Sequence, residues 1–88
     1  HLTLGSHKQA LALVKEALAV RKEVLGEGHA EYATSVHTLG LVYSESGDHK
    51  SALPPTRRAV ALRKACLGEK HPHYALSLSN LALLLQKM

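Results

Sequence analysis

A repeat of 42 residues limits what this chain of 88 residues can fold into more than any other feature. When the sequence is shifted by 42 positions, 17 of the 40 aligned pairs are identical. The identical pairs include His7/His49, Ala10/Ala52, Ala17/Ala59, Arg21/Arg63, Gly26/Gly68, His29/His71, Tyr32/Tyr74, Ser35/Ser77 and Leu39/Leu81. A fixed period of this length indicates similar units that stack on one another without one central core. We therefore assign residues 7–48 to one unit, residues 49–88 to a second, and residues 1–6 to the tail of a preceding unit.

Composition favours helices in each unit. Hydrophobic residues make up 45% of the chain and are mostly Leu and Ala, with no Ile, Phe or Trp. Leu and Ala are strong helix formers, whereas the β-branched and aromatic residues that favour strands are scarce. We predict an all-α protein, an α-solenoid of about four helices, and exclude a β-sandwich or barrel.

Each unit is predicted to contain two helices, at residues 8–25 and 31–46 in the first unit and at residues 49–67 and 73–88 in the second. Turn and cap residues support these limits. They are Gly26 and Gly68 after the two long helices, Ser6 and Asp48 at the starts of those helices, Gly47 after the second helix, and Pro72 in the first turn of the last one.

Two adjacent prolines, Pro54 and Pro55, lie just past the first turn of the helix predicted at residues 49–67. A proline at such a position removes a backbone hydrogen bond and crowds a preceding carbonyl, at a cost of ~3 kcal/mol if unrelieved. Three interpretations stay open: a kinked helix, a helix that begins later, or a shaped bend in a binding surface.

Charge and cysteine content argue against several classes of function. The formal net charge is +4 and the aromatic residues are three tyrosines. We expect no nucleic-acid binding, which needs a denser basic surface with stacking aromatics. No apolar run reaches the ~20 residues of a membrane span, so no membrane insertion is expected. The single cysteine, Cys66, forms no internal disulfide, which favours a reducing, cytoplasmic location.

Neither catalysis nor a cofactor is predicted. Serine, histidine and glutamate occur without the spacing of a catalytic triad, and no Gly-rich phosphate loop is present. His71 and His73 form the one close histidine pair, and His29 is the repeat counterpart of His71. Zinc needs three or four convergent ligands, so we expect no metal site. We predict instead that His29 and His71 cap the following helices or pack in the loops.

One helical face carries a recognisable pattern. Its residues are Val36, Leu39, Gly40 and Tyr43, spaced as V-x-x-L-G-x-x-Y, and small alanines follow in the next helix. This pattern resembles the tetratricopeptide repeat, in which a large residue, then Leu-Gly and Tyr, mark the first helix and small residues mark the second. The resemblance implies helix-turn-helix units that bind proteins and carry no catalytic centre.

The period of 42 residues exceeds the usual ~34 of that repeat and resembles the longer type found in kinesin light chains. In that type an extended second helix ends in a Leu-Gly-x-x-His-Pro-like loop, which residues 21–30 and 63–72 match, while residues 77–82 match the first helix. The departures from the pattern are Ala30, Pro55, Thr56, His73 and Leu85. A HEAT or armadillo array is the alternative fold, since its units have a similar length.

The resemblance also implies a concave groove, lined by the first helix of each unit, that holds a peptide. The corresponding positions here are Thr34, His37, Thr38, Leu41, Glu45, Leu76, Ser79, Asn80, Leu83 and Lys87. Asn80 matches the family's asparagine that hydrogen-bonds a peptide backbone, and Thr38 holds the same place in the first unit. The repeat-related Leu41 and Leu83 predict either an apolar strip or burial against a neighbouring unit.

We therefore predict an interaction scaffold that holds a peptide or protein segment between residues 31–46 and 73–88. Lys87, Arg57 and Arg58 favour acidic partners, unless they are simply solvated. The alternative is a structural self-assembly module. Repeat units need neighbours on both sides, so the two ends are expected to stack on other copies, or exchange helices with them, as a homo-oligomer.

Overall fold

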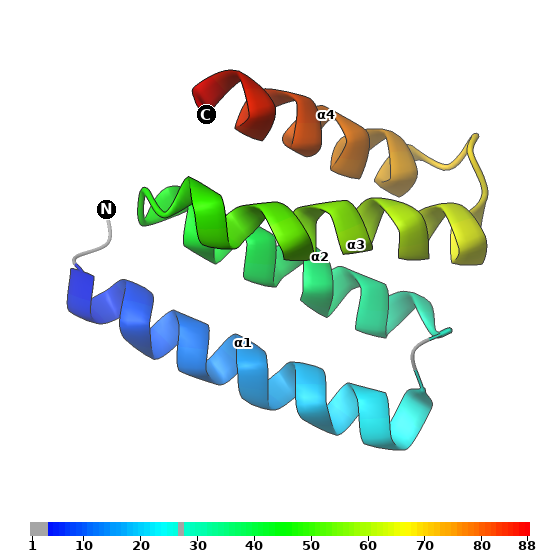
Figure 1. Cartoon of the computed structure of the whole chain (residues 1–88). Coiled ribbons are helices and arrows are strands. Elements are labelled where there is room, and N and C mark those ends of the chain that lie inside the picture. The colour runs from blue at the N-terminus through cyan, green and yellow to red at the C-terminus, as the bar shows by residue number, and fades with distance from the viewer. Residues whose placement is uncertain (1–3, 27) are drawn as a thin grey trace.

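The computed structural model describes residues 4–26 and 28–88, with side chains from Lys8 onward. This part of the chain is made of four helices and contains no strand. The helices are α1 (Leu4–Leu25), α2 (Ala30–Glu45), α3 (His49–Leu67) and α4 (Pro72–Lys87). They lie beside one another in chain order, as Figure 1 shows. The prediction of an all-α, solenoid-like chain is confirmed.

The start of α1 differs from the prediction. The helix begins at Leu4 and not at Lys8, so the backbone of residues 4–6 belongs to the first long helix. Ser6 lies inside the first turn of α1, and its prediction as an N-cap is therefore wrong. Residues 1–3, the rest of the predicted tail, lie outside the described residues.

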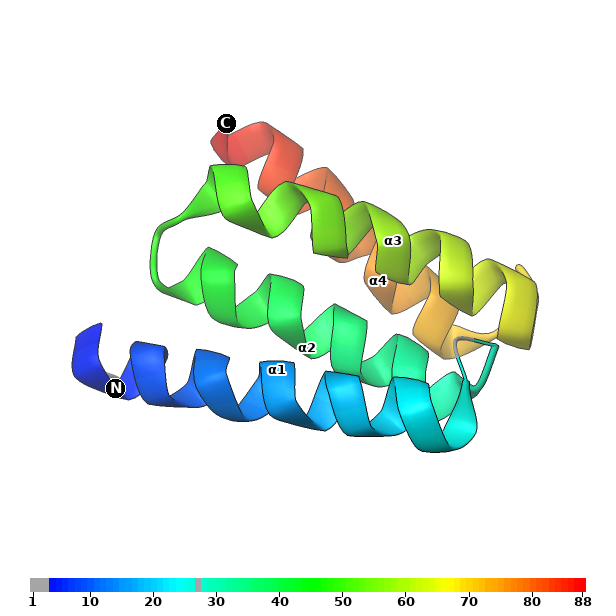
Figure 2. The ribbon, with the colours of Figure 1, turned by 60° about the horizontal axis from the view of Figure 1, so that its bottom comes forward.

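Each helix packs on the next one along the chain, and short turns reverse the direction between them (Figures 1 and 2). The most extensive packing is between α2 and α3. Helix α1 packs against α2, and α4 packs against α3. The four helices together measure 34 × 32 × 19 Å. Among the described helices, α2 and α3 each pack extensively against two others, and most buried residues lie on these two helices.

The helix ends follow the cap chemistry of the sequence. Gly26, Gly47 and Gly68 have positive φ angles of 84°, 88° and 89°, which glycine adopts without strain. The Nδ1 atom of His29 accepts a hydrogen bond from the backbone N–H two residues on, at 3.1 Å, and His71 does the same at 3.0 Å. Of the two predicted roles of these histidines, capping the following helix is the one observed. The same cap contact therefore occurs in both units.

The Pro54-Pro55 pair lies within a continuous helix. Asp48 caps α3 by accepting the Ser51 N–H at 3.2 Å, and the helix begins at His49, so its start is not delayed. Both prolines fall inside the helix, where they lack the N–H groups that would bond to the carbonyls four residues earlier. Pro54 is exposed and Pro55 half-buried, and the residues four positions earlier, Lys50 and Ser51, are exposed and half-buried.

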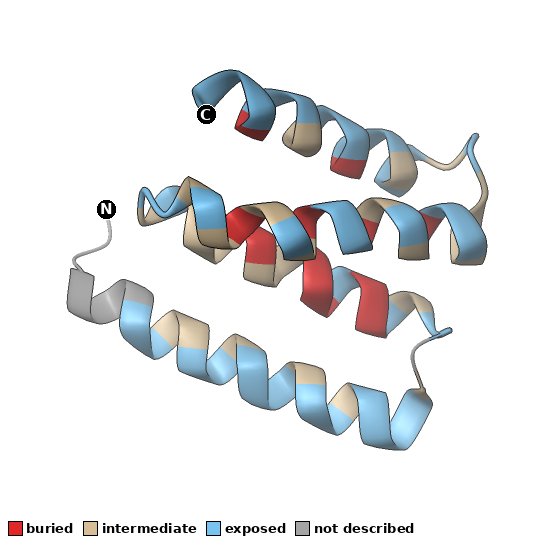
Figure 3. Ribbon diagram, viewed as in Figure 1, coloured by how far each residue is buried: buried red, intermediate tan, exposed pale blue. Residues whose placement is uncertain are grey.

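The hydrophobic core lies where α1, α2 and α3 meet. Tyr32, Val36 and Ala59 are buried there, with Leu18 and Leu62 packed against them. Figure 3 shows buried residues along α2 and α3, two on α4, and none on the described part of α1. Burial therefore follows the number of neighbouring helices more closely than it follows the repeat.

Candidate functional site

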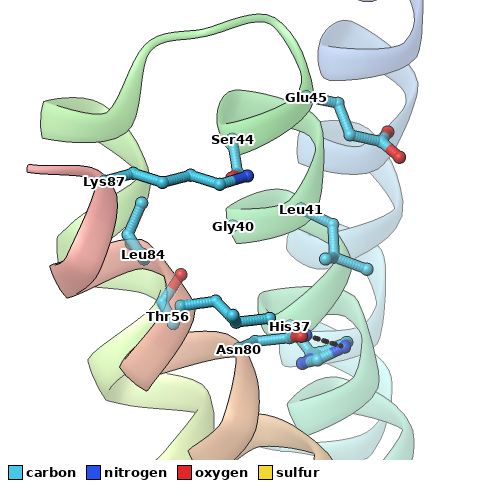
Figure 4. A pocket seen from close by; sticks show the side chains of 10 residues that line it. His37, Gly40, Leu41, Ser44, Glu45, Thr56, Asn80, Leu84 and Lys87 are labelled. Atoms are coloured by element: carbon cyan, nitrogen blue, oxygen red, sulfur yellow. Dashed lines mark hydrogen bonds between the residues drawn. The ribbon is translucent and has the colours of Figure 1, made fainter.

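A pocket of about 200 Å³ opens between α2, α3 and α4 (Figure 4). Residues from all three helices line it. They are His37, Gly40, Leu41, Ser44, Glu45, Thr56, Asn80, Leu83, Leu84 and Lys87. Side chains of α2 and α4 therefore form the walls, and Thr56 on α3 contributes to the floor.

Six of the ten positions suggested by the family resemblance line this pocket. They are His37, Leu41, Glu45, Asn80, Leu83 and Lys87. The other four do not. The Oγ1 atoms of Thr34 and Thr38 donate to carbonyls of their own helix, at 3.1 and 3.0 Å, while Leu76 and Ser79 are exposed elsewhere on α4.

The floor of the pocket depends on a close approach of α2 and α3 at Gly40. A Cβ atom at Gly40 would lie 2.5 Å from Thr56 Oγ1 and 3.3 Å from Thr56 N, so only glycine fits. Thr56 Oγ1 is held in place because it donates to Ala52 O at 2.7 Å. Thr56 departs from the family pattern, and this contact explains how a hydroxyl is accommodated there.

The walls combine apolar and charged side chains. Leu41 is 37% exposed and Leu83 54% exposed, whereas Leu84 is buried. Within the described residues, Leu41 and Leu83 are therefore exposed apolar side chains beside the pocket. Lys87 extends from α4 toward Ser44 on α2, and Glu45 lies further along α2 (Figure 4). The pocket thus combines an apolar surface with the positively charged Lys87 and the negatively charged Glu45.

A chain of hydrogen bonds joins α2 to α4 at the inner end of the pocket. His37 is only 8% exposed. Its Nδ1 lies 3.2 Å from Ser77 Oγ, and its Nε2 lies 3.2 Å from Asn80 Nδ2. Burial, followed by the positive charge of Arg63 and the influence of His73, lowers the pKa of His37 from 6.5 to about 4. The ring is therefore neutral at pH 7.

Arg63 lies behind this chain and is buried, at 3% exposure. Its Nη1 donates to His73 O at 3.2 Å and to Ser77 Oγ at 3.0 Å, and its Nη2 donates to Thr34 Oγ1 at 3.4 Å. Among the described residues no carboxylate forms an ion pair with Arg63, and its Nε has no hydrogen-bond partner. Burial lowers the pKa of the guanidinium, which still remains charged.

The first unit has equivalent hydrogen bonds from its arginine to the following helix. Arg21 Nη1 donates to Glu31 O at 3.0 Å and to Ser35 Oγ at 2.9 Å. The signal for this contact was present in the sequence, because both the arginine and the serine recur at the repeat spacing. The spacing alone does not show that these arginines reach the next helix.

Other basic and sulfur-bearing residues lie away from the pocket. Arg58 contacts Tyr32, with its Nη2 3.4 Å from the phenol oxygen and its guanidinium 5.8 Å from the ring centre. Arg57 is exposed on α3, outside the pocket lining. Cys66 is half-buried and donates its thiol hydrogen to Gly28 O. Of the basic residues predicted to favour acidic partners, only Lys87 lines the pocket.

His29, His71 and His73 lie at the starts of α2 and α4. The rings of His71 and His73 are 4.9 Å apart, but His71 Nδ1 is already used in the helix cap. In the described part of the chain no three His, Cys, Asp or Glu side chains come together as a metal site would require. None of the helices at residues 4–26 and 28–88 has the length and hydropathy to cross a bilayer.

Stacked helical hairpins with a concave face define an all-α repeat protein of the solenoid class. Comparison with known families matches residues 1–65 to the tetratricopeptide repeat. The chain therefore belongs to the tetratricopeptide repeat family, whose members generally mediate protein–protein interactions and are generally non-catalytic. A search of curated proteins finds no match.

Proposed function

We propose that the chain is a scaffold that binds an extended segment of a protein partner in the pocket between α2, α3 and α4. The observation that carries this proposal is the convergence of six family-suggested positions, from two repeat-related helices, on one pocket. Leu41 and Leu83 supply exposed apolar area, and burial of such area drives most association. Asn80 supplies a polar group that fixes the orientation of a bound chain.

The proposal also covers the subtype of the repeat and the cellular location of the protein. The 42-residue spacing and the loops after Gly26 and Gly68 support repeats of the kind found in kinesin light chains. We place the function in the cytoplasm, because a single cysteine without a disulfide partner favours a reducing compartment.

Two variants of α4 test the pocket with a matched control. Peptides of 12 residues would be selected from a phage-displayed library on the wild-type protein, and their affinities measured by fluorescence polarisation. Leu83→Glu alters the pocket, whereas Leu78→Glu alters another face of the same helix at comparable exposure, 54% against 41%. We expect Leu83→Glu to weaken binding by about tenfold or more and Leu78→Glu to leave it within about twofold. Equal effects of the two variants would contradict the pocket.

The second candidate function is self-assembly through the outer faces of α1 and α4. Leu13, Val20 and Val24 on α1 are 67%, 53% and 73% exposed, and Leu78 and Leu85 on α4 are 41% and 47% exposed. The exposed α4 face repeats the α2 face that packs on α3, and α1 repeats α3. A second copy could therefore pair its α1 with α4 in the arrangement that α2 and α3 have within one chain.

Steric detail limits how closely such copies approach. The internal pair needs Gly40 opposite Thr56, but the repeat counterparts are Ala82 and Val14. A methyl group at position 82 would meet the branched side chain of Val14 where glycine meets threonine within one chain. A head-to-tail pair must therefore be wider than the internal one. Sedimentation velocity over a range of concentrations tests this: association that Leu78→Glu abolishes supports it, and a monomer at every concentration rules it out.

A further inference from the structure

The buried chain of hydrogen bonds behind the pocket has a direction. A guanidinium can only donate, so Arg63 occupies one lone pair of Ser77 Oγ and accepts nothing from it. Ser77 Oγ also lies 3.2 Å from His37 Nδ1. The hydroxyl hydrogen of Ser77 is then free to point at Nδ1, and the chain runs from Arg63 through Ser77 to the imidazole ring.

The charge of Arg63 reinforces this direction. A bare Nδ1 lone pair facing a buried cation is electrostatically favourable, whereas an N–H dipole aimed at the cation is not. A neutral imidazole carries its single proton on one of its two nitrogens. With Nδ1 accepting from Ser77, that proton lies on Nε2, the nitrogen that faces Asn80.

The amide of Asn80 must complement the proton on Nε2. Asn80 Nδ2 lies 3.2 Å from His37 Nε2, and because an amide nitrogen only donates, this orientation of the amide fits a bare Nε2 and not an Nε2–H group. Rotation of the amide by 180° exchanges its oxygen and nitrogen without moving the rest of the side chain, so the tautomer of His37 decides which atom faces the ring. An Nε2–H group requires the oxygen, and the NH₂ group then turns toward the pocket.

We propose that Arg63, Ser77 and His37 act as positioning residues, which hold the NH₂ group of Asn80 toward the pocket and make it select a hydrogen-bond acceptor oxygen on the bound peptide. The proposal rests on the peptide-binding function proposed above. Arg63 and Ser77 do not line the pocket, and His37 uses both ring nitrogens on its neighbours. Asn80 is therefore the member of the chain that offers free hydrogen-bonding capacity to a ligand.

The neutral state of the ring supports the same arrangement. Burial and Arg63 lower the pKa of His37 to about 4, so the imidazole ring is neutral at pH 7. The ring then carries one proton, on either Nδ1 or Nε2. The charged and titratable groups around the ring are Arg63 on α3 and His73 on α4. Neither of them is an acid that would favour a protonated ring.

The tautomer can be read directly in the free protein. Long-range ¹H–¹⁵N NMR at pH 7 distinguishes protonated from bare imidazole nitrogens, and His37→Gln assigns the signals. We expect a protonated Nε2 and a bare Nδ1 for His37, with the preference reduced in Ser77→Ala. A protonated Nδ1 in the wild-type protein would overturn the proposal whether or not any peptide binds.

The selectivity is tested with Asn80→Asp and Asn80→Ala against a phage-selected 12-residue peptide. Aspartate keeps an oxygen for His37 but offers no donor to the ligand, so we expect it to weaken binding at least as much as alanine, by about tenfold. Asn80→Asp binding as tightly as wild type, while Asn80→Ala does not, would overturn the proposal. If Leu83→Glu left affinity unchanged while NMR showed Nε2–H, the peptide site would fail and the positioning chain would stand.

Discussion

Helices α2 and α4 are copies of one helix with different surroundings. On α2 the face that carries Val36 and Gly40 is buried, with Val36 1% exposed. On α4 the same face carries Leu78 and Ala82, and Leu78 is 41% exposed. The difference arises because α3 covers this face of α2, whereas no described helix covers it on α4 (Figure 3).

This comparison shows that the repeat sets the shape of each unit, and the position in the stack sets how much each residue contributes to stability. Features local to one turn, such as the His29 and His71 caps, are the same in both units. Features that need a neighbouring helix differ, as they do for Val36 and Leu78. Paired substitutions at equivalent positions therefore measure the contribution of stacking.

The largest difference is expected at the close contact of α2 with α3. Gly40→Leu would place a side chain where a Cβ already lies 2.5 Å from Thr56 Oγ1, and should cost more than about 3 kcal/mol of unfolding free energy. Ala82→Leu, at the exposed counterpart, should change it by less than about 0.5 kcal/mol. Urea unfolding monitored by circular dichroism measures both.

A second pair of variants separates clash from other effects at this contact. Gly40→Ala should be destabilising, and adding Thr56→Ala should recover part of the loss, because the nearest atom is then removed. Additive effects of the two substitutions would show that the clash is absent.

The next effect is loss of buried apolar volume. Val36→Ala should lower the unfolding free energy by about 2 kcal/mol, because Val36 is 1% exposed and its neighbours cannot fully close the cavity. Leu78→Ala should cost less than about 1 kcal/mol, since Leu78 is 41% exposed and alanine favours the helix. Thermal unfolding of both variants tests the ranking, and a larger loss at Leu78 would contradict the described stacking.

A smaller effect is expected from pH. The folded-state pKa of His37, about 4, lies below its ordinary 6.5, so the unfolded chain binds the extra proton first as pH falls. Stability should therefore be complete above pH 6.5 and fall between pH 6.5 and 4, by roughly 1–2 kcal/mol since the pocket water screens the ring in part. His37→Gln should flatten this part of the profile, whereas His49→Gln, at a half-buried histidine in α3, should not. An unchanged slope in His37→Gln would exclude His37 as its source.

The smallest and most even effect should come from the caps. His29→Ala and His71→Ala each remove one side-chain acceptor from a helix N-terminus, at about 0.5 kcal/mol. Similar losses in both units, measured by urea unfolding, would confirm that local features do not depend on stacking. A much larger loss at one of them would show that this cap also has a tertiary role.

Much of the fold could be predicted because its determinants are local. Glycine at the ends of the long helices, Asp48 and Pro72 at helix starts, and apolar spacing are all visible in the sequence. The start of α1 was misjudged because Ser6 is a good cap residue that lies inside a helix. The sequence left open whether Pro54 and Pro55 delay the helix, and in the structure α3 begins at His49, ahead of both.

The pocket could be predicted only in part. Helical spacing together with the family resemblance grouped Leu41 with Asn80 and Leu83, which line one pocket, but it does not reveal which rows of side chains another helix covers. Thr34 and Thr38 turned out to bond within α2. Gly40 and Thr56 line the pocket where α2 and α3 approach closely, and the identity of Thr56 as the partner of Gly40 is not encoded by a pattern within one helix.

The most direct test of the account is to locate a bound peptide. Titration of the ¹⁵N-labelled protein with the tightest phage-selected peptide, followed by ¹H–¹⁵N correlation spectra, reports which residues it contacts. Binding in the pocket predicts that the largest shifts occur at Leu41, Asn80 and Leu83, which line it. Largest shifts at Leu13 and Val20 on α1, or at Leu78 and Leu85 on α4, would instead place the interaction on the outer faces and contradict the proposed site.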